Sequence, residues 1–484
     1  MMGQAQISTI PGRIRQKSLS LALGFLLTAC AAGGDMNDPD SALFQLSFDP
    51  YVAEASVLRL IADARKTIDI SLYELDNKNI ANALVEAHQR RKITVRMSTD
   101  YDSEPTPGYQ TVILAGIPVK LGNGGAIMHD KYIIVDSKYV VTGSTNLKGD
   151  APLWGYTPTG MYAHFNNMAI VKSPELAADF QRDFDVQWGG VYGNPIGQYG
   201  DKKEAAYNGG GSWPENKYNI GSHTVQAFFT PYNKNFSSYS ANLMGDPDCS
   251  TVGISLTVPT HETQCMTISC GSAPTDAANC PGIVAASFPT CYQTSLGRTI
   301  YHYYNYDKMQ NECSATSATS ANSDIYKSAL NVVISQIRQA QKSITFLVFA
   351  FTDRVIMDEL MKAYARGLEV KVWMDYNQYR SNYRNSGASF VQLRKAIGNV
   401  KLCRKWDSGL LHHKVLLVDD KTVILGSMNY SNAGANSNDE NFLLIQNAEG
   451  LVGMFKQEIG RIDQQSFYLP PVEDDGSYIG NAGD

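Results

Sequence analysis

One segment of this chain occurs twice. Ala64-Arg-Lys-Thr-Ile-Asp-Ile-Ser-Leu-Tyr73 is matched by Ala340-Gln-Lys-Ser-Ile-Thr-Phe-Leu-Val-Phe349. In each copy an amphipathic helix pattern precedes a β-rich run, and a second helix and alternating strands follow. A later strand contains Val119-Lys-Leu121 in one copy and Val400-Lys-Leu402 in the other. Because strands that alternate with helices form sheets covered by helices, we expect an α/β fold of two pseudo-twofold-related halves packed into one body.

The repeat divides the chain of 484 residues, which is long enough for two cores. We expect a signal peptide over 1–29, a first half over 41–190, a linker and cysteine-rich insert over 191–322, a second half over 323–466 and a flexible tail over 467–484. Ser173-Pro174-Glu175 predicts the start of a helix that closes the first half near Trp188. A strand-like run at 224–229 falls in the linker, whereas the insert shows little helical or strand periodicity.

The N-terminal segment has the pattern of an export signal. Arg13, Arg15 and Lys17 precede the apolar run LALGFLL, which is too short to span a hydrocarbon core of about 30 Å. The run ends at Leu27-Thr28-Ala29-Cys30, which resembles the lipobox of bacterial lipoproteins, where the cysteine carries the lipid. We therefore expect an exported protein, lipid-anchored through Cys30 in a bacterial cell envelope. An ordinary secreted protein with a nearby cleavage site is the alternative.

The charge of the chain limits the substrates it can attract. The formal net charge is −6, and loss of residues 1–29, with three basic and no acidic side chains, would make it −9. Tight binding of long nucleic acids requires several contacts from Lys or Arg to phosphate, which an acidic chain does not favour. A polyanionic substrate must therefore be attracted by a local positive patch.

Most of the cysteines cluster in the insert. Six fall within one window: Cys249, Cys265, Cys270, Cys280, Cys291 and Cys313. In an exported chain this cluster predicts up to three disulfides that staple a loop-rich segment, with the pairing left open. A zinc cluster is the alternative, but the window contains no CxxC pair. Cys403 lies apart from the others, and we expect it to be a buried free thiol.

The strongest motif occurs once in each half. The first copy consists of His129, Lys131, Asp136, Gly143, Ser144 and Asn146, and the second of His412, Lys414, Asp419, Gly426, Ser427 and Asn429. Both fit H-x-K-x4-D-x6-G-S-x-N without a gap. A single HxK would be uninformative, because the pair arises by chance in many strands. Six fixed positions that recur at equivalent places in a repeat are not a chance match.

The motif spacing predicts a phosphate pocket. Residues i and i+2 of a strand project from the same face, so each histidine and its lysine point the same way. The Gly-Ser turn then brings a hydroxyl and an amide beside the lysine. Two halves that face each other would combine two imidazoles, two ammonium groups, two hydroxyls and two amides. We interpret Asp136 and Asp419, at the ends of buried strands, as structural residues.

The two motifs resemble those of the phospholipase D superfamily, and the resemblance covers roughly residues 44–190 and 325–465. It implies that one histidine attacks phosphorus to form a phosphohistidine, while the other protonates the leaving oxygen and later deprotonates water. It implies no metal and no cofactor. It also implies which groups neutralise the phosphate charge, with the serines in support: Lys131, Lys414, Asn146, Asn429, Ser144 and Ser427.

Glu440 distinguishes the two histidines. The family supports its nucleophilic histidine with a carboxylate from the opposite half, downstream of that half's GSxN. Glu440 occupies this place in the second half, whereas the first half offers only the amides of Asn166 and Asn167. We therefore predict that His129 is the nucleophile, oriented by Glu440, and that His412 is the general acid. His413 is expected to face away from the site in a structural role.

The expected reaction is hydrolysis of a phosphodiester by a monomer. A phospholipid head group is the favoured substrate, because a lipid anchor would hold the enzyme at a membrane. A nuclease is the alternative, since residues 166–188 resemble the corresponding segment of bacterial nucleases of the superfamily. A binding or adhesion protein with a degenerate enzyme core is a remote alternative, and the intact motifs argue against it. No obligate protein partner is implied.

Overall fold

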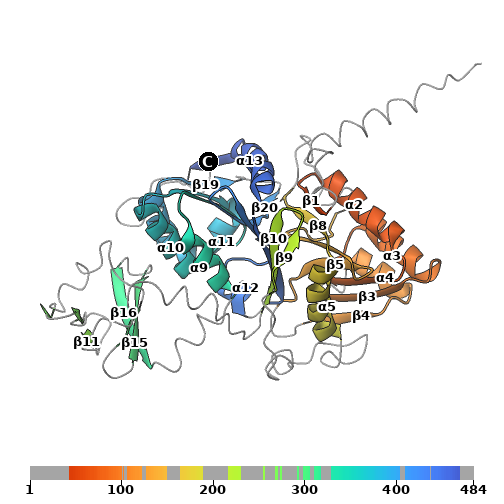
Figure 1. Cartoon of the computed structure of the whole chain (residues 1–484), viewed down its shortest axis with the longest axis horizontal. Coiled ribbons are helices and arrows are strands. Elements are labelled where there is room, and N and C mark those ends of the chain that lie inside the picture. The colour runs from red at the N-terminus through yellow and green to blue at the C-terminus, as the bar shows by residue number, and fades with distance from the viewer. Residues whose placement is uncertain are drawn as a thin grey trace, which may run out of the picture.

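The computed structural model describes residues 43–100, 102, 106–122, 127–149, 164–188, 216–230, 329–403, 409–436 and 438–468, together with the backbone of several strands between 254 and 317. The predicted signal peptide, Cys30 and most of the predicted tail lie outside these residues. Figure 1 shows two α/β lobes side by side, with β9 and β10 between them.

The first half is built on a seven-stranded sheet with the order β1-β8-β6-β5-β2-β3-β4. Its strands are β1 (Phe44–Ser47), β2 (Thr67–Leu72), β3 (Thr94–Asp100), β4 (Val119–Gly122), β5 (Lys131–Val135), β6 (Tyr139–Gly143) and β8 (Met168–Lys172). Its helices are α2 (Pro50–Asp63), α3 (Lys78–Gln89), α4 (Pro107–Leu114) and α5 (Pro174–Trp188). The predicted closing helix is α5, and the Ser173 hydroxyl caps it by accepting the backbone N–H of Leu176.

The second half is built on a nine-stranded sheet with the order β9-β10-β23-β22-β21-β17-β18-β19-β24. Its strands are β9 (Tyr218–Ile220), β10 (His223–Thr230), β17 (Ser343–Val348), β18 (Glu369–Asp375), β19 (Val400–Cys403), β21 (Lys414–Val418), β22 (Thr422–Gly426), β23 (Glu440–Gln446) and β24 (Ser466–Tyr468). Its helices are α9 (Leu330–Gln339), α10 (Arg354–Ala365), α11 (Tyr376–Ile397), α12 (Asn432–Asn436) and α13 (Glu449–Asp463).

The two sheets repeat one topology, which confirms the predicted α/β fold of two related halves. In each sheet two crossovers join three parallel strands, β2-β3-β4 in the first and β17-β18-β19 in the second. The strand of the HxK motif lies antiparallel beside the first strand of each set, as β5 or β21. The equivalence extends outward, because β10 pairs antiparallel with β23 as β1 pairs with β8.

This topology changes the division of the chain that the sequence suggested. The strand-like run at 224–229 is β10 of the second sheet and not part of a linker. The insert after it therefore lies between β10 and α9, within the second half. It contains two small three-stranded sheets, so it has more regular structure than its periodicity indicates.

The strands of the insert are β11 (Ile254–Leu256), β12 (Ile268–Cys270), β13 (Ala273–Pro274), β14 (Cys291–Gln293), β15 (Arg298–Asn305) and β16 (Gln310–Ser317). Cys249, Cys265 and Cys280 lie outside the described residues. The disulfides therefore stay a prediction. Cys403, by contrast, is a buried free thiol, as predicted.

The two halves share a hydrophobic core. Each sheet is covered on its outer side by its own helices, which make a separate core in each half. Between the sheets lies a third core with residues from both halves, among them Phe180, Phe229, Leu347, Val415 and Phe455. Because burial of apolar area is the main driving force of folding, this shared core holds the halves together as one body.

Short backbone pairings join the halves directly in front of each motif histidine. In one, β20 (Leu410–Leu411) pairs parallel with β7 (His164–Phe165). In the other, Met128 forms a parallel bridge with Asp439. The backbone that leads into His129 is therefore fixed by the second half, and the backbone that leads into His412 is fixed by the first.

The motif aspartates make hydrogen bonds to the backbone at the start of the neighbouring strand. Asp419 has a left-handed φ of 52°, and its carboxylate accepts the backbone N–H groups of residues 341–343 at distances of 2.7–3.1 Å. Asp136 holds residues 65–67 in the same way. Burial alone would raise the pKa of Asp419, but the three N–H donors outweigh it and lower that pKa. Each aspartate thus pins the start of the neighbouring parallel strand, β17 or β2.

We expect Asp419→Asn to lower the free energy of unfolding by about 1–2 kcal/mol, because it removes charge-assisted hydrogen bonds. Asp420→Asn is the matched control. Asp420 is also left-handed, but it makes only surface ion pairs with Lys342 and Lys456, so its loss should cost less than about 1 kcal/mol. Urea unfolding checks both variants. Because the pKa of Asp419 is lowered, its contribution should be complete at neutral pH and disappear below about pH 4. Equal destabilisation by the two variants would contradict this account.

Candidate active site

Both motif histidines lie at the boundary between the halves. The backbone N–H of His129 donates to the carbonyl of Asp439 at 2.8 Å, and that of His412 donates to the carbonyl of Phe165 at 2.9 Å. Only 8% of His129 and 9% of His412 is exposed. Each histidine is thus almost fully buried and is positioned by the half to which it does not belong.

The side-chain partners of the two histidines differ in charge. Nδ1 of His129 lies 2.7 Å from Oε2 of the fully buried Glu440. Nδ1 of His412 lies 2.8 Å from Oδ1 of Asn166. The structure therefore contains the cross-half contact that the sequence predicts for His129. It also places an amide at the equivalent position beside His412.

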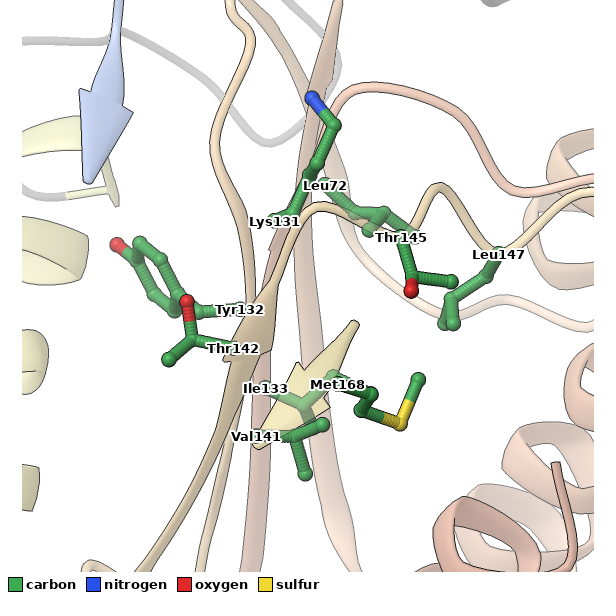
Figure 2. A pocket seen from close by; sticks show the side chains of 9 residues that line it. All are labelled: Leu72, Lys131, Tyr132, Ile133, Val141, Thr142, Thr145, Leu147 and Met168. Atoms are coloured by element: carbon green, nitrogen blue, oxygen red, sulfur yellow. The ribbon is translucent and has the colours of Figure 1, made fainter. Parts of the chain in front are cut away.

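The motif lysines begin β5 and β21, two residues after their histidines. Nζ of Lys131 donates to the His129 carbonyl at 2.8 Å, and Nζ of Lys414 donates to the His412 carbonyl at 3.0 Å. Figure 2 shows Lys131 extending above a small pocket lined by Leu72, Tyr132, Ile133, Val141, Thr142, Thr145, Leu147 and Met168. The aliphatic part of the Lys131 side chain thus packs against apolar side chains. This packing restricts the position of its ammonium group.

An aromatic ring lies beside each histidine–lysine pair. Tyr73 lies with its ring centroid 5.1 Å from that of His129, and Nζ of Lys131 lies 5.3 Å from the Tyr73 ring. Phe349 takes the same place in the second half, 4.7 Å from His412 and 4.7 Å from Nζ of Lys414. Such rings attract a cation and restrict its position. Tyr73 and Phe349 end the repeated segment, so the repeat itself marks them.

Burial disfavours the charged forms of these groups. It lowers the pKa of His129 to about 4 although Glu440 opposes the shift, and it lowers the pKa of Lys131 to about 8. The pKa values of His412 and Lys414 fall well below their ordinary values for the same reason, and the neighbouring lysines add to both shifts. An anion bound among these groups would favour their charged forms.

The motif serines both make hydrogen bonds within the protein. Ser144 donates its hydroxyl to Oδ1 of Asn166 at 2.9 Å, and Ser427 donates to the carbonyl of Asn441 at 3.2 Å. Both serines are fully buried, and each also accepts a backbone N–H from the neighbouring strand. Each hydroxyl has one proton and uses it within the protein, so in this arrangement the serines position the site. Their support of phosphate binding stays a prediction.

The glycine and the asparagine of each GSxN segment lie in close contact with the backbone or are buried. A Cβ on Gly143 would lie 2.4 Å from the carbonyl oxygen of Asn167, and one on Gly426 would lie 2.2 Å from that of Asn441, so only glycine fits at either turn. Oδ1 of Asn146 is buried and has no hydrogen-bond partner among the described residues. Oδ1 of Asn429 accepts the Ala350 N–H at 3.4 Å.

The middle residues of the two HxK motifs face away from the lysines. His413 is buried, with Nδ1 2.9 Å from Nδ2 of Asn167 and Nε2 3.5 Å from Glu458, which fits the predicted structural role. Its counterpart Asp130 accepts hydrogen bonds from Gln187 at 2.7 Å and from Asn441 at 3.0 Å. Both side chains therefore fasten the motif strand to the rest of the protein.

Sequence analysis missed two aspartates behind the histidines. Asp100 accepts the backbone N–H of Met128 at 2.8 Å, and Asp375 accepts that of Leu411 at 2.9 Å. The signal was present, because the equivalent strands β3 and β18 both end in an aspartate.

No group of three His, Cys, Asp or Glu residues in the described part of the chain could hold a metal ion. Over the same residues, no helix is long and apolar enough to cross a membrane.

The comparisons with known proteins agree with this geometry. Residues 57–188 and 333–462 each match the family model described as "Cardiolipin synthase, PLD-like domain", and together they make up more than half of the chain. A mitochondrial cardiolipin hydrolase of Chlamydomonas reinhardtii is 29% identical over 27% of this chain and 55% of that protein. A phospholipase D of Rickettsia conorii is 32% identical over 24% of this chain and 56% of that protein. The chain thus spans about half the length of the curated relatives it matches.

Among solved structures, the phospholipase D family member Nuc of Salmonella typhimurium is 29% identical, with a TM-score of 0.27. The match covers 29% of this chain and 90% of Nuc. The family model matches twice, once in each half of the fold, and each match contains one complete HxK and GSxN motif. The chain therefore belongs to the phospholipase D superfamily, and each of its halves contains one PLD-like domain.

Proposed function

We propose that this protein is a phospholipase D-type phosphodiesterase that hydrolyses a phospholipid head group through a phosphohistidine on His129. The observation that carries the proposal is the unequal pairing of the histidines, since Glu440 faces His129 and Asn166 faces His412. An imidazole that donates Nδ1–H to a carboxylate presents Nε2 as a lone pair. The carboxylate also stabilises the positive charge that the ring acquires when it becomes phosphorylated.

In the first step Nε2 of His129 attacks phosphorus, so that an N–P bond forms as the P–O bond to the leaving group breaks. His412 donates its proton to the leaving oxygen, which departs as an alcohol. His412 is then neutral. The lowered pKa of His412 favours this transfer, because a weakly basic imidazole gives up its proton readily.

In the second step water attacks the phosphohistidine. His412 accepts a proton from the water, the new O–P bond forms, and the N–P bond to His129 breaks. The products are an alcohol and a phosphomonoester, and both histidines return to their initial states. One pair of residues thus serves both steps with the roles of His412 reversed.

The lysines and amides stabilise charge on the non-bridging oxygens throughout. Lys131 and Lys414 approach from opposite halves, and the electrostatic influence of Lys131 reaches Lys414. A phosphodiester between them brings a negative charge, and the pKa values of both lysines rise when it binds. The two lysines therefore stabilise the negative charge of the phosphate both when the substrate binds and during the reaction.

The substrate class is supported by the relatives, whose names are cardiolipin hydrolase and phospholipase D. We expect purified protein to hydrolyse phosphatidylcholine or cardiolipin vesicles and to leave single- and double-stranded DNA intact. Activity should survive EDTA, because lysines and amides neutralise the phosphate. The matched control is His129→Ala, which should lower kcat by at least about 10³-fold. Cleavage of DNA without lipid hydrolysis would instead assign a nuclease of the same superfamily.

The division of roles is tested by trapping the intermediate. With a substrate whose leaving group needs no protonation, His412→Asn should accumulate phosphoenzyme, since water is no longer activated. The acid-labile phosphoryl group should lie on His129, as located by mass spectrometry. Glu440→Gln should slow its formation at least about 10-fold, and Asn166→Ala should slow it less. A phosphoryl group on His412 would contradict the assignment.

We also propose that the protein acts from the cell envelope, anchored by a lipid on Cys30. Support comes from the charged and apolar pattern of residues 13–30 alone. In a bacterial host, Cys30→Ser should move the protein from the membrane fraction to the soluble fraction or stop processing of the precursor. Cys403→Ser, at the buried free thiol, is the control and should not change the fractionation. Unchanged membrane association of the Cys30 variant would argue against the anchor.

A further inference from the structure

Asp100 and Asp375 occupy equivalent positions at the ends of β3 and β18. One carboxylate oxygen of each accepts the backbone N–H of the residue just before the motif histidine, Met128 in one half and Leu411 in the other. The second oxygen of Asp375 caps α11 by accepting the Gln378 N–H at 2.9 Å. The two aspartates are 4% and 0% exposed. The backbone in front of each histidine is thus held from behind by a buried carboxylate.

The second half depends on its aspartate more than the first. Glu440 provides a negative charge against His129. Four carboxylates oppose the lowering of the Lys131 pKa, namely Glu440, Asp130, Glu74 and Asp100. In the second half the residue that faces His412 is the neutral Asn166. Glu440 and Asp375 are the carboxylates that oppose the lowering of the Lys414 pKa. Both carboxylates belong to the same half as Lys414, and of the two only Asp375 also holds the backbone before His412.

We propose that Asp375 is a positioning residue for the general-acid half, which fixes the backbone before His412 and adds its charge to that of Glu440 beside Lys414. The inference rests on the proposed function. Asp375 touches no substrate atom in this scheme, because it acts through Leu411 and Lys414. Asp100 makes the equivalent backbone contact in the other half, where its charge is less critical because three further carboxylates oppose the lowering of the Lys131 pKa.

The surroundings of Asp375 give its charge a dependence on pH. Burial raises the pKa of this carboxyl to about 6, although three backbone N–H groups and Lys414 oppose the shift. The opposing N–H donors belong to Asn377 and Gln378 on α11 and to Leu411 on β20. On β19 the register partner is Cys403, whose thiol points to the carbonyl of Ile462. The carboxylate is therefore ionised only above about pH 6, where it can act as a counter-charge.

The test is the pH profile of kcat/KM for Asp375→Asn, which retains one hydrogen-bond acceptor and removes the charge. Wild-type activity should rise with pH through about 6 as Asp375 ionises. In Asp375→Asn the pH at which kcat/KM rises (the acid limb of the profile) should move toward about 4, where His129 loses its proton. The highest value of kcat/KM, reached on the plateau of the profile, should fall at least about 10-fold. Asp353→Asn is the matched control, since Asp353 is an N-cap aspartate of the same half that accepts the Ile356 N–H. It should keep the wild-type limb.

Asp100→Asn is a second control and should shift the limb less than Asp375→Asn. An acid limb that stays in the wild-type position in Asp375→Asn would overturn the inference, whatever the plateau. If the wild-type protein hydrolyses no phosphodiester, it is the proposed function that fails.

Thermal unfolding tests the charge of Asp375 without any substrate, so it separates failure of this inference from failure of the proposed function. Because the folded-state pKa of Asp375 is raised, its ionisation destabilises the fold as pH rises through about 6. The melting temperature of Asp375→Asn minus that of wild type should therefore increase from pH 5 to pH 7. A constant difference would contradict the charge assigned to Asp375.

Discussion

The site depends on an exchange of hydrogen bonds between the halves. Each motif histidine receives its backbone acceptor and its ring partner from the opposite half, as His129 does from Asp439 and Glu440. A half on its own would expose these groups to water and would lack the partners that orient them. Neither half can therefore build its histidine correctly alone. The shared core and the short pairing of β7 with β20 hold the two halves in the position that these hydrogen bonds need.

The protein obtains two different histidines from a nearly symmetric frame. Backbone contacts, lysines, aromatic rings and rear aspartates occur in both halves, and the ring partner of the histidine differs. A buried carboxylate at 2.7 Å favours a cationic ring far more than an amide at 2.8 Å does. Strong desolvation amplifies this difference, because burial lowers the pKa of both imidazoles. One change of residue type is thus enough to give the two imidazoles different electrostatic surroundings.

Much of this was predictable from sequence. The repeat of strands and helices predicts the fold class. The two-residue spacing of His and Lys predicts that both side chains project the same way, because alternate residues of an extended segment share a face. The contact of Glu440 with His129 also followed, since the motif order gives its place in the fold.

Other features depend on tertiary pairing that no local pattern encodes. The direction of the Ser144 hydroxyl is decided by the neighbouring Asn166 and Asn167, and the role of β10 is decided by β23. Asp375 looks like an ordinary strand-ending residue until the chain returns at Leu411. The motif predicts which residues lie at the candidate site, and the register of adjacent strands determines the contacts that each of them makes.

The most direct test of the central claim is a ¹⁵N NMR titration of histidine-labelled protein, which reports the tautomer and charge of each imidazole. At pH 7 the ring of His129 should be neutral, with its proton on Nδ1 toward Glu440 and a free lone pair on Nε2. Glu440→Gln should weaken this preference and leave the His412 signal in place. A His129 ring that carries its proton on Nε2, or that is doubly protonated at pH 7, would contradict the account.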